Sequence, residues 1–267
     1  MKKSFSILLM MSLFLTFVSA ANAADNGDGF RSALKQTSFQ EVVVGGQGKI
    51  KIPGSSYIHS IQGKILPEFF INIGSVGGAT FDGGVILNGT QWEAVIFGGA
   101  EGASVWKAVN INSITGQTID LKLVGENVNG SFEVGLYING SRVVSVNENT
   151  NTSQGGKLGW LARDPYYSGV WTLSYELNMV PVEAYAGIRY HTLTDSSGKR
   201  AFFDGAELTN ALPVKKAGGT LNLSQFKWSS VKNCDDPQYS QLEVDKLVYN
   251  VSNQTYLYTS INFNSLS

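Results

Sequence analysis

The sequence predicts an all-β protein built from antiparallel strands and arranged as a sandwich or a barrel. Three observations support this fold class. Short segments alternate apolar and polar residues with a period of two, glycine supplies 30 of the 267 residues, and Asn-Gly dipeptides separate several of the alternating runs. About fourteen such runs follow one another, with almost no helical periodicity between them.

The alternation is clearest in segments 118–124, 132–138 and 170–177. Each segment places aliphatic or aromatic side chains on one face and mostly polar or small side chains on the other. One apolar face per strand is typical of antiparallel sheets that cover a core on one side only. We therefore expect these segments to be core-facing strands, and FRSALKQ (30–36) to be the one short helix.

The expected turns contain asparagine and glycine. Asn88-Gly89, Asn129-Gly130 and Asn139-Gly140 each predict a tight hairpin, because a type I′ turn needs positive φ at both central residues. VGLYINGSRVVSV (134–146) is the best example. Gly45-Gly46-Gln47-Gly48 is also expected to form a hairpin turn, because a strand-like segment and no helix follows it.

The first 23 residues have the layout of a secretory signal peptide. Lys2 and Lys3 precede an apolar run from Ile7 to Val18, and Ala21-Asn22-Ala23 matches an A-x-A cleavage site. The apolar run is shorter than the roughly 20 residues that a membrane-spanning helix needs. We expect a bacterial protein that is secreted to the extracellular space as one β-sandwich domain, residues 24–267.

Composition limits the partners. The formal net charge is −1 over the whole chain, and no basic stripe is present, so a nucleic-acid partner is not expected. The single cysteine, Cys234, leaves no internal disulfide and is expected to be a buried, small apolar residue. We expect a monomer with no transmembrane segment in the mature chain.

No catalytic motif is complete. His59 and His191 are far apart in the sequence, and neither a G-x-S-x-G elbow nor a P-loop is present. Asp25-Asn26-Gly27-Asp28-Gly29 resembles part of a calcium loop, but the third acidic ligand and the distal glutamate are missing. We expect no cofactor and no metal site, with structural calcium elsewhere as the open alternative.

One pair of acidic residues remains a weak catalytic candidate. Glu243 and Asp245 lie two residues apart in LEVDKLVY, so on a strand they project from one face about 7 Å apart. That spacing suits the acid and nucleophile of a glycoside hydrolase. The simpler interpretation is a solvent-facing polar row, because Leu242, Val244 and Val248 would occupy the other face.

Aromatic residues supply the candidate ligand-binding groups. Sugar rings stack on tryptophan and tyrosine, while polar side chains bind the hydroxyl groups. Three groups fit this pattern: the long segment 148–169, the predicted strand 185–193 and the predicted strand 255–263. Their candidate residues are Trp160, Arg163, Asp164, Tyr166 and Tyr167; Tyr185, Arg189 and His191; and Tyr256 and Tyr258. Structural packing is the alternative role for all three groups.

Segment 118–146 resembles the paired strands of concanavalin-A-like jelly rolls, the superfamily of lectins and glucanases. The matching piece is Leu136-Tyr137-Ile138-Asn139-Gly140. This resemblance implies a jelly-roll sandwich of two antiparallel sheets with a glycan-binding concave face. Glucanases of the superfamily carry E-x-D-x-x-E or E-x-D-x-x-x-E on one strand, whereas this chain has Val248 or Tyr249 in place of the last glutamate. The whole chain also resembles the YrpD-type uncharacterised secreted proteins of bacilli.

Three functional hypotheses follow. The first is a non-catalytic, lectin-like sandwich that binds a polysaccharide or cell-envelope glycan by stacking and hydrogen bonds. The second is a secreted glycoside hydrolase or lyase with an atypical carboxylate pair such as Glu243 and Asp245. The third is a structural protein of the cell surface or biofilm that associates through exposed strand edges.

Overall fold

The computed structural model describes residues 29–37, 43–75, 79–100, 103–129, 131–159, 170–185, 188–234, 239–250 and 255–266. The strands are β1 (Phe30–Gln36), β2 (Val43–Lys51), β3 (Ile58–His59), β4 (Ile65–Ser75), β5 (Thr80–Asn88), β6 (Gln91–Ala100), β7 (Ala103–Ile111), β8 (Thr118–Val128), β9 (Ser131–Ile138), β10 (Ser141–Asn147), β11 (Val170–Pro181), β12 (Phe202–Lys215), β13 (Trp228–Cys234), β14 (Val248–Asn250) and β15 (Leu257–Asn262). The helical segments are η1 (Ser55–Tyr57), η3 (Glu183–Tyr185), η4 (Tyr190–Thr192), η5 (Leu223–Gln225), α4 (Gln241–Asp245) and η6 (Phe263–Ser265).

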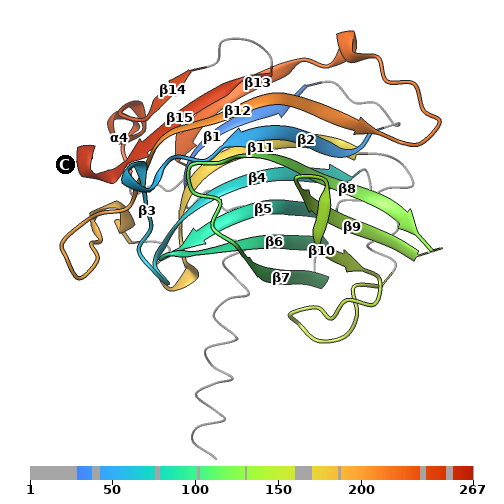
Figure 1. Cartoon of the computed structure of the whole chain (residues 1–267), viewed down its shortest axis with the longest axis horizontal. Coiled ribbons are helices and arrows are strands. Elements are labelled where there is room, and N and C mark those ends of the chain that lie inside the picture. Colours follow the sequence, from blue (N-terminus) through green and yellow to red (C-terminus); the bar gives the residue numbers. More distant parts are fainter. Residues whose placement is uncertain are drawn as a thin grey trace, which may run out of the picture.

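The strands form two antiparallel sheets. Sheet A has seven strands in the order β13-β1-β11-β4-β5-β6-β7. Sheet B has the order β10-β9-β8-β2-β12-β15-β14, and β3 pairs with β12 at its side. Figure 1 looks onto the broad faces of the two stacked sheets. The chain crosses between them repeatedly, so the predicted all-β, antiparallel two-sheet jelly-roll sandwich is confirmed.

Hairpin connections follow the Asn-Gly pattern. The three dipeptides lie between β5 and β6, between β8 and β9, and between β9 and β10. Asn129 has a φ of 52°, and Asn139 and Gly140 have φ values of 51° and 80°. Positive φ at both central residues gives the β9–β10 turn the twist that matches its two strands. The predicted hairpin at 134–146 is therefore confirmed.

The core lies between the two inner faces, and Tyr175 of β11 joins the sheets. Its ring is 1% exposed, and its hydroxyl oxygen lies 2.8 Å from the backbone oxygens of Gln47 and Leu212 in sheet B. Glycines in β2 make room for this ring. A Cβ at Gly46 would lie 2.6 Å from Leu173 Cδ1 and 2.8 Å from Tyr175 Oη.

The predicted turn at Gly45-Gly46-Gln47-Gly48 is therefore wrong. These residues lie inside β2, where each pairs with a residue of β8. Glycine is needed there because the neighbouring chain is close: a Cβ at Gly45 would lie 2.1 Å from the backbone oxygen of Leu123. A run of glycines thus marks close packing within the sandwich instead of a change in chain direction.

The helix predicted at 30–36 is also wrong, because this segment is β1, paired with β11 and β13. Phe30, Ala33 and Leu34 are all buried. Phe30 and Leu34 face the core, whereas Ala33 is buried on the opposite face of sheet A. Because apolar residues are buried on both faces of β1, the segment does not alternate with a period of two. Its apolar residues Phe30, Ala33 and Leu34 are instead spaced i, i+3, i+4, as on one face of a helix.

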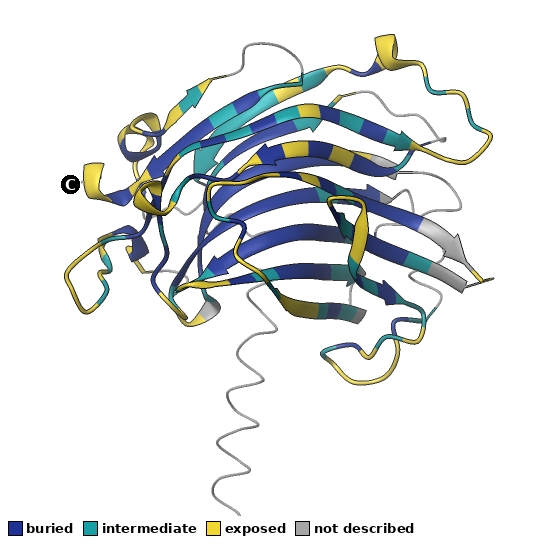
Figure 2. Cartoon of the chain, in the orientation of Figure 1, coloured by how far each residue is buried: buried dark blue, intermediate teal, exposed yellow. Residues whose placement is uncertain are grey.

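The outer faces of the two sheets differ. Strand β2 of sheet B alternates between buried and exposed residues, whereas the seven central residues of β5 in sheet A are all buried (Figure 2). A second apolar cluster lies on the outer face of sheet A. Its members are Leu66, Phe70, Ile86, Val95, Phe97 and Val180. Sheet B therefore presents a polar, accessible outer face, whereas the outer face of sheet A is more apolar and more buried.

Two further features concern the chain as a whole. Cys234, at the end of β13, is half-buried and packs against the core. Within the described ranges, no helix is long and apolar enough to cross a membrane. The predicted signal peptide (1–23) and residues 25–28 of the calcium-like segment lie outside those ranges, so both remain predictions.

Candidate functional site

A groove crosses the outer face of sheet B. Its volume is about 520 Å³, within the size range of small-ligand pockets. It spans β2, β8, β9 and β12, and the Asn139-Gly140 turn closes one side. The lining residues are Gln47, Gly48, Lys49, Asp120, Leu121, Lys122, Tyr137, Gly140, Asn210 and Leu212. We call this feature the sheet B groove.

Strand register brings the polar side chains of the groove together. Lys49 lies opposite Asp120, and Lys122 lies opposite both Gln47 and Tyr137. Residues that face each other across strands share a face of the sheet. The Lys49 ammonium is 3.5 Å from the Asp120 carboxylate, and the Lys122 ammonium is 4.6 Å from the centre of the Tyr137 ring. The groove thus holds an aromatic ring beside charged and amide groups.

Two irregular positions shape the ends of the groove. Asn210 has a φ of 54° and lies where the register between β12 and β2 shifts, between Thr209 and Leu212. Such a bulge turns a side chain out of the regular row, and asparagine tolerates this backbone conformation. At the other end, the Asn139 side chain accepts a hydrogen bond from the Asp120 backbone N–H at 2.9 Å.

A polar row on the same face continues beyond the groove. Glu207 of β12 lies opposite Lys51 of β2 and Tyr258 of β15. Lys51 donates a short hydrogen bond to the Glu207 carboxylate, and this bond raises the pKa of Lys51. Burial and the Glu207 charge raise the pKa of Tyr256. The candidate tyrosines Tyr256 and Tyr258 are therefore half-buried neighbours of an ion pair on the sheet B face.

The strand predicted for Glu243 and Asp245 is wrong, because these residues lie in helix α4. Ser240 and Glu243 form a capping box: the Ser240 side chain accepts from the Glu243 backbone N–H, and the Glu243 side chain accepts from the Ser240 N–H. Ser-x-x-Glu is the sequence signature of a helix start. Leu242 is 69% exposed and Val248 is 56% exposed, so the expected apolar face does not exist either.

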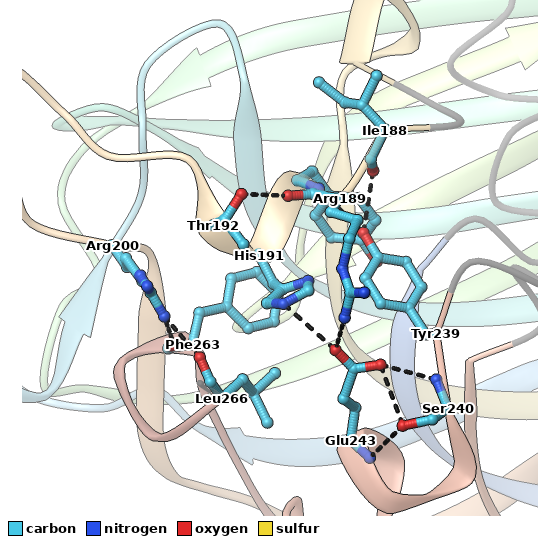
Figure 3. A network of polar contacts seen from close by, with 11 residues as sticks. Ile188, Arg189, His191, Thr192, Arg200, Tyr239, Ser240, Glu243, Phe263 and Leu266 are labelled. Atoms are coloured by element: carbon cyan, nitrogen blue, oxygen red, sulfur yellow. Dashed lines mark hydrogen bonds and ion pairs between the residues drawn. The ribbon is translucent and has the colours of Figure 1, made fainter.

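The strand predicted at 185–193 is wrong as well. The described part of this segment forms the short helices η3 and η4, and it brings Arg189 and His191 to Glu243 (Figure 3). One oxygen of the Glu243 carboxylate forms a close ion pair with the Arg189 guanidinium. The same oxygen lies 3.4 Å from His191 Nε2. The other accepts from the Ser240 N–H at 2.7 Å. Tyr185 is half-buried, and Lys64 lies 5.8 Å from its ring centre.

This network connects segments that are distant in the sequence, and it is surrounded by aromatic rings. The ring centre of Tyr239 lies 5.0 Å from that of His191, and the Tyr239 hydroxyl accepts from the Tyr190 N–H at 2.9 Å. Arg200 donates to the backbone oxygens of Phe263 and Leu266 beside it (Figure 3). His191 is 1% exposed. A buried, ring-lined network of this kind holds α4 and the C-terminal segment to the sandwich.

Stability should fall as the pH is lowered below neutral, because burial opposes the charged form of His191. Burial and the nearby Arg189 lower the pKa of His191, against the opposing charge of Glu243. In the unfolded chain the His191 imidazole has an ordinary pKa near 6.5. As the pH falls, it therefore binds a proton in the unfolded chain before it does so in the folded one. The stabilising contribution is complete above about pH 6.5 and decreases as the pH falls toward the folded pKa.

Urea unfolding at pH 7.5 and pH 5.5 measures this effect. The wild-type free energy of unfolding should fall more between the two pH values than that of His191→Gln, with a limit of about 1.4 kcal/mol per pH unit for one proton. An equal fall in both proteins would contradict the assignment.

The last group of candidate residues belongs to the long segment 148–169. Trp160, Arg163, Asp164, Tyr166 and Tyr167 lie outside the described residues and stay a prediction. No group of three or more His, Cys, Asp or Glu side chains in the described ranges could hold a metal ion.

The groove residues are not among the candidates predicted from the sequence, although one signal for them is present. Tyr137 alternates with Leu136 and Ile138 and therefore falls on the solvent side of a strong hairpin. A large aromatic residue on that side has no core to fill, which is a reason to suspect a ligand. Asp120 and Lys122 lie on the matching face of the neighbouring strand, but their pairing with Tyr137 depends on register.

No protein-family model and no curated protein matches the chain. Solved structures with similar folds include Scytalido-glutamic peptidase with a peptide-based transition-state analogue (TM-score 0.43, 13% identity, 88% of this chain and 98% of that one). Others are a Bacteroides ovatus mixed-linkage glucan GH16 protein (0.34, 14%, 58% and 69%) and sheep galectin-11 with glycerol (0.30, 15%, 55% and 91%). Such low values carry no information about ligand or activity.

Proposed function

We propose that this chain is an exported glycan-binding jelly-roll protein whose ligand occupies the sheet B groove. The observation that carries the proposal is the composition of the groove: one aromatic ring, Tyr137, beside Asp120, Asn210, Gln47 and two lysines. Aromatic rings stack on the C–H faces of sugars, while carboxylate and amide groups bind their hydroxyl groups. A groove of about 520 Å³ is large enough for a short oligosaccharide.

Charge narrows the ligand class. Lys49 and Lys122 line the groove with one carboxylate, Asp120, so its formal charge is positive. A sugar carboxylate drawn to Lys122 would also meet the Tyr137 ring, because the two groups are in contact. Glycans that carry carboxyl groups are therefore favoured over neutral ones.

The groove continues into the row of Lys51, Glu207 and Tyr258 on the same face of sheet B. Hydrogen-bonding groups repeated along a sheet face suit a polymer that lies across several strands. This arrangement favours a polysaccharide or a cell-envelope glycan over a single sugar.

Tyr137→Ala should weaken glycan binding about 5- to 150-fold, since a stacking ring in a binding site contributes on the order of 1–3 kcal/mol. Asp120→Asn should weaken it less. Pull-downs with polygalacturonate gel, cellulose, chitin and peptidoglycan sacculi measure the retained fraction. Tyr57→Ala is the matched control, because Tyr57 is 58% exposed on η1 and does not line the groove.

Retention of Tyr137→Ala equal to that of wild type would contradict the groove assignment. If Trp160→Ala alone loses retention, the predicted recognition segment 148–169 is the binding site instead. Lack of wild-type retention on all four polymers would count against glycan binding itself.

A further inference from the structure

Two carboxyl groups lie on the outer face of sheet A, away from the sheet B groove. Glu68 is on β4 and Glu176 is on β11, and these strands are neighbours. The residues next to them, Phe69 and Tyr175, face the core, so both carboxyl side chains point outward. Glu68 of β4 lies directly opposite Asn178 of β11. Glu176 is two residues before Asn178 on the same strand and is therefore the diagonal neighbour of Glu68. We call Glu68, Glu176, Asn178 and Ser174 the sheet A carboxylate site.

The two carboxyl groups have different surroundings. Glu68 is 5% exposed, Leu66 and Phe70 flank it along β4, and Ile86 lies opposite on β5. Burial in this apolar environment, together with the charge of Glu176, raises the pKa of Glu68 well above its usual value. Burial of this kind favours the protonated form of a carboxyl group.

Glu176, in contrast, is surrounded by polar groups. The Asn178 amide donates to one of its oxygens at 3.0 Å, and the Ser174 hydroxyl donates to the other at 3.4 Å. The Arg31 guanidinium lies 3.9 Å away. Hydrogen-bond donors and a guanidinium thus surround Glu176, whereas apolar side chains surround Glu68.

Folding does not account for this arrangement. Glu68 Oε2 and Asn178 Oδ1 are buried without a hydrogen-bond partner, although their residues are 5% and 2% exposed. A buried polar atom without a partner costs on the order of 1–3 kcal/mol, and an apolar residue would avoid that cost. Unsatisfied acceptors in a cluster of buried polar groups indicate a site that acts on a ligand.

We propose that Glu68 and Glu176 are the general acid and the general base of a hydrolytic site that cleaves glycosidic bonds. Glu68 donates its proton to the glycosidic oxygen while the bond from that oxygen to the anomeric carbon breaks. Glu176 takes a proton from a water molecule whose oxygen bonds to the same carbon. One water is consumed, and the products are an alcohol and a hemiacetal. Solvent exchange then restores both protonation states.

The charge of the site favours an acetal over an amide as substrate. Glycoside hydrolysis passes through a transition state that resembles an oxocarbenium cation, which the Glu176 carboxylate stabilises. Amide hydrolysis develops a negative oxygen that needs hydrogen-bond donors instead. Glu68 and Glu176 are diagonal neighbours on adjacent strands, and such residues are about 7–8 Å apart at the backbone. The proposal takes the inverting route, in which a water enters between the two carboxyl groups and attacks the anomeric carbon.

Reducing-end release tests this proposal on polygalacturonate, carboxymethylcellulose, xylan, laminarin and solubilised peptidoglycan. Wild type should release reducing ends from at least one polymer. Glu68→Gln and Glu176→Gln should each lower the rate about 100-fold or more. Glu93→Gln is the matched control: Glu93 is on the same face, two strands from Glu68, and this variant should stay within about twofold of wild type.

Further readouts separate chemistry from folding and from groove binding. Thermal unfolding establishes that the variants are folded; if Glu68→Gln does not fold, Glu68→Asp replaces it and should lower the rate. Tyr137→Ala should leave the rate on soluble substrate unchanged, so loss of groove binding and loss of hydrolysis are distinguishable. Proton NMR of the first product should show the inverted anomer.

No release from any polymer by wild type, or a Glu68→Gln rate equal to wild type, would overturn the proposal. Cleavage of casein that depends on Glu68 and Glu176, without reducing-end release, would replace the acetal substrate with a peptide.

Discussion

Tyr175→Ala is expected to lower the free energy of unfolding by about 3–5 kcal/mol. The ring is 1% exposed between the sheets, and its centre lies 5.6 Å from the ring centre of Trp228. Its removal leaves a cavity and takes the hydroxyl from two backbone oxygens of sheet B. Tyr175→Phe keeps the ring and removes only the hydroxyl, so it should cost about 1–3 kcal/mol.

Urea unfolding of the three proteins measures both steps, with the exposed Tyr57→Ala as a control that should change the free energy by less than about 0.5 kcal/mol. If Tyr175→Phe were as stable as wild type, the hydroxyl would not contribute to holding the sheets together. The spacing between the two sheets would then depend on apolar packing alone.

Glu243→Ala is expected to lower the free energy of unfolding by about 2–4 kcal/mol. The substitution removes the capping box of α4 and leaves the buried His191 without its acidic partner. Little of the effect is assigned to Arg189, because its side chain is 53% exposed and solvent screens that charge.

Asp245→Asn is the matched control for this prediction. Asp245 is exposed in the same helix and accepts only from the Gln241 side chain at 3.0 Å among the described contacts. Its substitution should change the free energy of unfolding by less than about 0.5 kcal/mol. Equal effects of the two substitutions would mean that the network around Glu243 does not stabilise the fold.

Local patterns in the sequence predicted the sandwich well where one face of a strand is solvated. Segment 132–138 alternates because sheet B has a solvent side, and Asn139-Gly140 forms the turn that its chemistry favours. The same reasoning failed at 30–36, where burial on both faces of sheet A removes the alternation. It also failed at Gly45–Gly48, because glycine is equally suited to turns and to close packing between sheets.

The candidate sites were harder to predict because they depend on register between distant strands. Glu68 and Glu176 are 108 residues apart in the sequence and meet only through the pairing of β4 with β11. Ser240 and Glu243 carried a visible capping signal, but the strand interpretation of LEVDKLVY obscured it. Pairing of β8 with β9 likewise unites Lys122 with Tyr137, and neither segment alone shows the groove.

The two proposed sites lie on opposite outer faces of the sandwich and make independent predictions. The sheet B groove is exposed and carries charge of both signs, as expected for reversible binding of a polymer. The sheet A carboxylate site is buried and contains the unsatisfied acceptors, as expected for chemistry protected from solvent. A polymer held at the groove would raise the local concentration of substrate near the same molecule.

The most direct test of glycan binding at the groove is an NMR titration of the ¹⁵N-labelled chain of residues 24–267. Tri-galacturonate, cellotriose and chitotriose serve as probes. We predict chemical-shift changes at Gln47, Lys49, Lys122, Tyr137 and Asn210, largest with the acidic trisaccharide and absent in Tyr137→Ala. Shift changes confined to other parts of the chain, or none with any of the three sugars, would contradict the proposed function.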